Sequence, residues 1–157
     1  MTTSLDPTEI RILSELQQDG RLTNNDLAER IGLSASPCWR RVKALEDSGV
    51  VRGYVALLDP HKVGIGESVF CNVTLERQTE GAVERFEQEV RRRPEIMECY
   101  AMTGDYDYLL RVVVDEVRTY DRFLQDFVFR LPGIAHVKSN FALREIKYET
   151  ALPLPRP

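Results

Sequence analysis

The fold of this chain is decided first by residues 23–51, which read TNNDLAERIGLSASPCWRRVKALEDSGVV. A helix is expected to begin after Thr23, because its hydroxyl can accept a backbone N–H group at a helix start. Asp26 lies three residues further on, where a carboxylate favours the positive end of the helix dipole. Gly32 then permits the sharp turn that closely packed helix pairs need. This stretch therefore predicts two short helices that meet at a glycine.

The second helix of the pair has distinct apolar and basic sides. It is expected to begin at Ser34 or Ser36, with Pro37 in the first turn, where a missing N–H group costs nothing. At about 100° per residue, one face is apolar. That face consists of Cys38, Val42 and Leu45. A helix that separates its core from a basic face is typical of the reading helix of a DNA-binding helix-turn-helix.

The basic side of this helix supplies the candidate DNA contacts. They are Ser34, Ser36, Trp39, Arg40, Arg41 and Lys43. We expect Arg40 to contact a base edge and Lys43 a phosphate. Arg41 lies close to the apolar face, which suits a phosphate or a structural carboxylate better than a base. The alternative is a solvated charged helix, but the caps, the glycine and the preceding helix favour the helix-turn-helix.

The flanking segments extend this unit. Asp6-Pro7-Thr8-Glu9 forms a capping box with proline at the first helical position, so a first helix is expected to run toward Gly20. Residues 50–57 are rich in β-branched residues and are expected to form a strand that ends at Asp59-Pro60. Such a strand indicates either a winged variant or a ribbon that pairs with a second subunit.

Composition limits the class of protein. The chain has 157 residues, 43% hydrophobic and 29% charged, which suits one ordinary domain or two small ones. No apolar run approaches the length of a membrane span, and no leader is apparent, so a cytoplasmic, nucleoid-associated protein is expected. Cys38, Cys71 and Cys99 are widely separated, which suits a reducing compartment, and we expect all three to fill cores.

Charge is concentrated rather than uniform. The net charge is −4, which alone disfavours a nucleic-acid partner. Residues 34–45, however, contain Arg40, Arg41 and Lys43 and no acidic residue. This local charge suits an oligomer that binds particular sites, because one copy supplies only a few phosphate contacts.

The second half of the chain predicts a different fold. The expected elements are a strand at 69–75, a helix at 83–90, strands at 96–103 and 108–114, a helix at 120–131 and a strand at 134–143. This order is β-α-β-β-α-β, a ferredoxin-like antiparallel sheet with both helices on one face. The fold class is therefore α+β, with a helix-turn-helix domain at 1–60, a linker at 61–67 and a second domain at 68–157.

The exposed face of that sheet predicts self-association. The strand at 108–114 carries apolar residues on both of its sides. One side packs under the helices, and the other needs a second cover. We therefore expect at least a homodimer.

Several ordered fragments are similar to one family. They are residues 12–21, 33–38, 41–46, 53–60 and 103–110. The chain resembles the leucine-responsive regulator/AsnC (Lrp/AsnC, feast/famine) transcription factors over almost its whole length, from about residue 5 to 154. The resemblance implies an N-terminal helix-turn-helix and a C-terminal domain that dimerises through its sheet. It also implies a higher oligomer, such as an octamer, and amino-acid binding where dimers meet.

The resemblance places the effector site in one segment. The candidate residues are Met102, Thr103, Gly104, Asp105, Tyr106 and Asp107. A glycine turn exposes backbone N–H groups to a carboxylate, and Asp105 or Asp107 can attract an ammonium group. The alternative is a plain hairpin turn capped by its aspartates. No cofactor is expected, and the identity of the amino acid is open.

Two other classes of function are alternatives to this interpretation. A small enzyme on a ferredoxin-like sheet is disfavoured, because His61 and His136 lie in no metal-ligand pattern. Residues 64–66 lack the third glycine of a dinucleotide loop and precede a strand instead of following one. A nucleoid-organising protein without an effector keeps the DNA-binding helix, and only a ligand assay separates it from the regulator.

Overall fold

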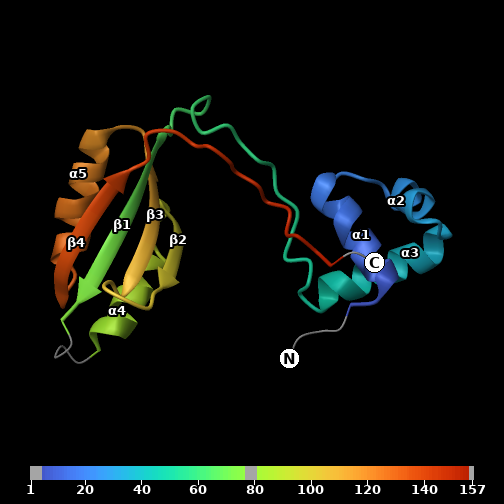
Figure 1. Cartoon of the computed structure of the whole chain (residues 1–157), viewed down its shortest axis with the longest axis horizontal. Coiled ribbons are helices and arrows are strands. Elements are labelled where there is room, and N and C mark those ends of the chain that lie inside the picture. The colour runs from blue at the N-terminus through green and yellow to red at the C-terminus, as the bar shows by residue number, and fades with distance from the viewer. Residues whose placement is uncertain (1–4, 77–80, 156–157) are drawn as a thin grey trace. The chain divides into compact units, whose positions relative to one another are not determined.

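The computed structural model describes residues 5–76 and 81–155, and the chain forms two compact units. Unit 1 consists of residues 1–57 and 146–157, and unit 2 of residues 58–145. Both units appear in Figure 1.

Unit 1 contains three helices, as the sequence predicted. They are α1 (Pro7–Gln18), α2 (Asn24–Ile31) and α3 (Ala35–Asp47). The predicted capping box is present, since Glu9 N donates to Asp6 Oδ1 and Asp6 N donates to Glu9 Oε2, both at 2.8 Å. Asp26 N donates to the Thr23 hydroxyl at 3.2 Å. Gly32 has φ +71°, a left-handed conformation that glycine adopts without strain, so the chain can turn directly into α3.

All three helices contribute to the core of unit 1. The buried cluster comprises Ile12, Leu13, Leu27, Ala28, Ile31, Cys38 and Leu45. Each fully buried large aliphatic side chain contributes roughly 1.5–3 kcal/mol. Val42 packs against this cluster but is only partly buried. The predicted apolar face of α3 is therefore present, and the opposite side of the helix stays exposed.

The backbone conformation shows that α3 begins directly after Ser34. Ser34 occupies the N-cap position, but its side chain makes no capping hydrogen bond. Ser36 lies inside the helix, so it does not cap it. Both serine side chains remain available on the exposed side.

The strand expected at residues 50–57 does not form within this chain. Residues 51–58 lie in neither a helix nor a strand. Among the described residues they find no neighbouring strand, and a strand without a ladder partner leaves its backbone groups to water. Val51 packs against the buried cluster of unit 1, but Val55 is 83% exposed and Leu57 62% exposed, so these two side chains are not buried there.

Unit 2 is the predicted β-α-β-β-α-β domain. Its elements are β1 (Glu67–Leu75), α4 (Ala82–Val90), β2 (Ile96–Ala101), β3 (Tyr108–Val114), α5 (Val117–Asp126), the 3₁₀ turn η1 (Val128–Arg130) and β4 (Ile134–Phe141). The sheet is antiparallel in the order β2-β3-β1-β4. The central pair β1 and β3 runs in register from Glu67 opposite Val114 to Val73 opposite Tyr108.

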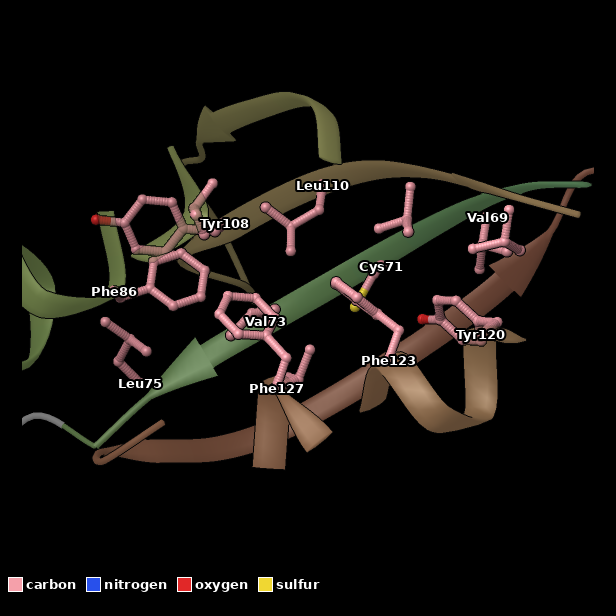
Figure 2. Close-up of a cluster of buried hydrophobic side chains, with 14 residues drawn as sticks. Val69, Cys71, Val73, Leu75, Phe86, Tyr108, Leu110, Tyr120, Phe123 and Phe127 are labelled. Atoms are coloured by element: carbon pink, nitrogen blue, oxygen red, sulfur yellow. The ribbon is translucent and has the colours of Figure 1, made fainter. Parts of the chain in front are cut away.

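One face of this sheet carries the core. Figure 2 shows Val69, Cys71 and Val73 of β1 on the same side as Tyr120, Phe123 and Phe127. Phe86 of α4 packs on Tyr108 with ring centroids 4.6 Å apart. Because side chains alternate along a strand, the intervening residues point to the other face. We call that other side of the sheet, away from α4 and α5, the open face.

Several predicted boundaries were wrong by a few residues. The helix expected at 120–131 begins at Val117, ends at Asp126 and continues as η1, so tight turns replace its last α-helical turn. β2 ends at Ala101 and β4 at Phe141, each two residues early, where ladder partners run out. Cys38 and Cys71 are buried as expected, but Cys99 is exposed because β2 is an edge strand.

The last described residues belong to unit 1, whereas the sequence placed everything from 68 to 157 in the second domain. Leu152 exchanges two hydrogen bonds with the Gln17 side chain on α1: Leu152 N donates to Oε1 at 2.6 Å, and Nε2 donates to Leu152 O at 3.2 Å. Leu154 packs against the buried cluster of unit 1. These contacts group residues 146–157 with the helices.

Candidate nucleic-acid interface and effector site

The exposed side of α3 presents most of the predicted DNA-contacting residues together. Ser34, Ser36, Arg40 and Lys43 are exposed, and Trp39 is 57% exposed. Trp39 and Lys43 also line a hollow of ≈ 270 Å³ that is completed in part by Asn24 and Tyr54. An exposed indole, guanidinium and ammonium on one helix are suited to a negatively charged, partly apolar groove.

Arg41 is the exception among the candidate DNA contacts. Its guanidinium forms an ion pair with the carboxylate of Asp6, the N-cap residue of α1. The hydrogen bond from the Glu9 backbone, followed by that from Arg41, lowers the pKa of Asp6 below its ordinary value. Of the two partners expected for Arg41, a phosphate or a structural carboxylate, unit 1 provides the carboxylate.

Other contacts hold α3 on its remaining sides. Asn24 Nδ2 at the start of α2 donates to the carbonyl of Ala35 at 2.8 Å. The Tyr54 hydroxyl donates to Glu46 Oε1 at 3.0 Å. Lys43 pairs with Asp47 at 2.8 Å along the helix, which raises the pKa of its ammonium group. The orientation of α3 within unit 1 is thus fixed by α1, α2 and the segment that follows it.

The predicted effector segment forms the connection between β2 and β3. Met102 N donates to Asp107 O at 2.8 Å, which closes the turn at its base. Gly104 has φ +114°, a conformation that residues with a side chain rarely adopt. For the backbone N–H groups of residues 103–106 the structure gives no hydrogen-bond partner within the described ranges. A turn of this kind offers donors to an anionic group.

Asp107 has a structural contact in addition to its predicted ligand role. Its Oδ2 accepts the backbone N–H of Leu75 at 2.7 Å, and its own N–H donates to Val73 O at 3.0 Å. The β1–β4 register shifts between Thr74 and Leu75, and the side chain of Asp107 provides the acceptor at that irregularity. Asp105 is exposed.

A hollow of ≈ 280 Å³ adjoins this turn. It is lined by Leu75, Glu76, Ala82, Val83, Ala101, Asp107 and Tyr108. The Tyr108 hydroxyl donates to Glu87 Oε1 at 3.0 Å. Burial, followed by this hydrogen bond, raises the pKa of Tyr108 to about 12, so the phenol stays protonated near neutrality. The hollow is just smaller than typical small-molecule pockets and is partly open to solvent.

Sequence reasoning missed residues that only the fold brings to these sites. Asp6 was recognised as a helix cap, but nothing in the sequence links it to Arg41, 35 residues later. Likewise, Ala82 and Val83 reach the hollow beside Asp107 because α4 follows β1 across the sheet. The antiparallel pairing of β1 with β3 brings the end of β1 near residue 107. The predicted antiparallel sheet was the one feature of the sequence that indicated this proximity.

Two further kinds of feature are absent from the residues that the structure describes. Among residues 5–76 and 81–155, no group of three or more His, Cys, Asp or Glu side chains is arranged to hold a metal ion. Over the same residues, no helix is long and apolar enough to cross a membrane.

A helix-turn-helix with an exposed basic helix, together with a β-α-β-β-α-β domain, defines a DNA-binding transcriptional regulator. Comparison with known families agrees for both halves. Residues 5–52 match the winged helix-turn-helix DNA-binding model, and residues 68–152 match the Lrp/AsnC ligand binding domain. The chain belongs to the Lrp/AsnC family of transcriptional regulators, which are not enzymes.

Relatives extend over nearly the whole chain. The Bkd operon transcriptional regulator of Pseudomonas aeruginosa is 43% identical over 150 residues, covering 96% of this chain and 98% of the relative. The leucine-responsive regulatory protein of Klebsiella pneumoniae is 39% identical over 148 residues, covering 94% and 90%. A transcriptional regulator of Neisseria meningitidis, solved in complex with L-methionine, is 45% identical with a TM-score of 0.90, covering 96% of this chain and 97% of that one.

Proposed function

We propose that this regulator changes its DNA binding when a free amino acid binds at residues 102–107. The single observation that carries the proposal is the β2–β3 turn, where open backbone donors, a left-handed Gly104 and the Asp107 carboxylate adjoin a hollow of ≈ 280 Å³. The donors suit a carboxylate and the aspartate an ammonium group, so the two ends of an amino acid find opposite partners. The L-methionine bound by the Neisseria meningitidis relative supports this chemical class of ligand.

The DNA contacts we propose come from the exposed side of α3. Arg40 reads a base edge, Lys43 contacts a phosphate, and Trp39 lies against the groove wall with Ser34 and Ser36 at the start of the helix. The exposure of these residues supports the assignment. Arg41 helps to hold α3 against α1 and does not contact a base, because its guanidinium is already paired with Asp6.

We propose that the active form is a homodimer, assembled further into a higher oligomer such as an octamer. The open face of the sheet supports the dimer, since Phe70 is 38% exposed there and Tyr100 53% exposed. The exposed apolar segment around Val55 and Leu57 offers a second surface for a partner copy. The open side of the hollow leaves room for residues from a neighbouring dimer. We place the protein in the cytoplasm, bound to the nucleoid.

A thermal-shift screen of the twenty amino acids tests the effector proposal. A ligand of the folded protein raises the melting temperature in proportion to the logarithm of its concentration once it saturates the site. We expect one or a few amino acids to do so in the parent chain and to fail in Gly104→Val. The control is Gly64→Ala, a change at another left-handed glycine away from the β2–β3 turn. No shift with any amino acid would instead indicate a nucleoid-organising protein without an effector.

A further inference from the structure

The C-terminal residues form an unexpected part of the DNA-binding unit. The side-chain amide of Gln17, near the end of α1, both accepts from and donates to the backbone of Leu152. Two residues later, Leu154 packs against the buried cluster of unit 1. We call these interactions the tail contact; Figure 1 shows the red segment before residue 156 running to α1.

The tail contact is specific in its chemistry. A glutamine amide that satisfies both the N–H and the C=O of one residue reproduces the pairing of a strand neighbour, so it fixes the tail's register as well as its place. Leu152 is 70% exposed, whereas Leu154 is partly buried. The tail therefore packs through the side chain of Leu154 and is hydrogen-bonded through the backbone of Leu152.

α1 connects this contact to the DNA-binding helix. At its other end, Asp6 caps α1 through Glu9 and also holds the guanidinium of Arg41 on α3. In between, Ile12 and Leu13 share a buried cluster with Cys38 and Leu45 of α3. A displacement of α1 therefore cannot leave α3 unchanged, because close-packed cores transmit shifts between their elements.

We propose that the tail contact positions α1 and, through α1, the DNA-binding helix α3, so that DNA affinity depends on residues 152–154. Unit 2 is then joined to the DNA-binding unit at both of its ends, through residues 57–58 and through residues 145–146. The second connection gives the ligand-binding domain a path to α3 separate from the segment that follows α3. This inference needs only DNA binding and holds whether or not an amino acid is the effector.

The test uses the full chain with two variants and two matched controls. Gln17→Ala removes both hydrogen bonds, and Leu154→Ser removes the packed side chain. Gln18→Ala changes the exposed neighbour on α1, and Leu143→Ser changes a leucine that is 98% exposed. Hydrogen exchange reports release of residues 150–155, and titration measures affinity for a DNA site selected from a random library with the parent chain.

We expect both test variants to exchange the tail amides about tenfold faster while circular dichroism still shows folded helices. Their affinity for the selected DNA should fall roughly three- to tenfold, with a smaller ratio of specific to random DNA binding, and both controls should match the parent. Gln17→Glu keeps the acceptor but loses the donor, so its effect should lie in between. Tail amides as slow as in the parent, or a released tail with parental DNA affinity, would overturn the proposal.

Discussion

At the residue scale, two adjacent arginines of α3 differ in their contacts within unit 1. Arg41 and Arg40 are adjacent in sequence, yet within residues 5–76 and 81–155 only Arg41 is ion-paired with another helix. A guanidinium that already binds a carboxylate must give up that pair if it moves to DNA. Arg40 has no carboxylate partner among the described residues, so it gives up no ion pair there when it binds DNA. Adjacent arginines can therefore differ in function although their chemistry is identical.

The first prediction concerns Arg40 and Lys43. Arg40→Ala should cost roughly 1–3 kcal/mol on the selected site and relax its sequence preference, because a bidentate base contact is lost. Lys43→Ala should weaken all sequences alike and reduce the salt slope by about one. Both are measured by titration at several salt concentrations. Arg11→Ala, an exposed arginine on α1, is the control, and equal losses on selected and random DNA for Arg40→Ala would refute its role.

Asp107 allows its structural and ligand-binding roles to be separated. Asp107→Asn keeps an oxygen that can accept from Leu75 N but removes the charge, so effector affinity should fall while the melting temperature holds. Asp107→Ala leaves that N–H group without its acceptor and should also destabilise unit 2 by roughly 1–3 kcal/mol. Calorimetric titration and thermal unfolding measure the two effects. If Asp107→Asn binds the effector as tightly as the parent, the carboxylate does not hold the ammonium group.

At the element scale, the open face of the sheet is the surface that most needs a partner. Its side chains alternate along β1 and β3 with the buried ones. They include Phe70, Leu109 and Val113 together with polar groups. Arg111 on this face pairs with Glu98 of β2 at 2.9 Å, so its charges are partly neutralised within the sheet. A face of this mixed character can pack against an identical face.

A charge placed on the open face tests the dimer. Phe70→Asp should raise the dimer dissociation constant by about tenfold or more, because the carboxylate must lose its water when the faces meet. Light scattering over a dilution series measures this change. Val117→Asp, at an exposed position in the first turn of α5, should associate as the parent does. If Phe70→Asp retains the parent's mass at every concentration, the copies associate through another surface.

The elements themselves were predictable where local signals were strong. The capping box at Asp6, the Thr23 cap and the turn at Gly32 were all found as expected, because each depends on residues within one turn of the chain. The strand at 50–57 was not found, since a strand needs a partner that local sequence does not supply. The same limit explains why the Asp6–Arg41 pair and the tail contact at Gln17 were missed.

At the scale of the whole molecule, the chain leaves the DNA-binding unit after Leu57 and returns to it at Ile146. Unit 2 is therefore inserted within unit 1 in sequence. The predicted effector site and the candidate DNA contacts lie in different units, so any response of one to the other is a coupling between distinct sites.

Two-fold assembly predicts the form of the DNA site. A dimer joined through the open face presents two α3 helices, and two-fold symmetry relates the half-sites that they read. We expect a rough palindrome with half-site centres about 34 Å apart, or one helical turn. Footprinting on library-selected DNA measures this spacing. Protection of a single asymmetric half-site by a monomer would be incompatible with the proposed assembly.

The most direct test of the account is a DNA titration with and without the amino acid that raises the melting temperature most. The account predicts that this amino acid changes the affinity of the parent chain for its selected DNA by about fivefold or more. It also predicts that Gly104→Val, whose Cβ would occupy a backbone with φ +114°, keeps the parental DNA affinity but loses the response. Identical DNA affinity with and without the bound amino acid in the parent chain would contradict the central claim.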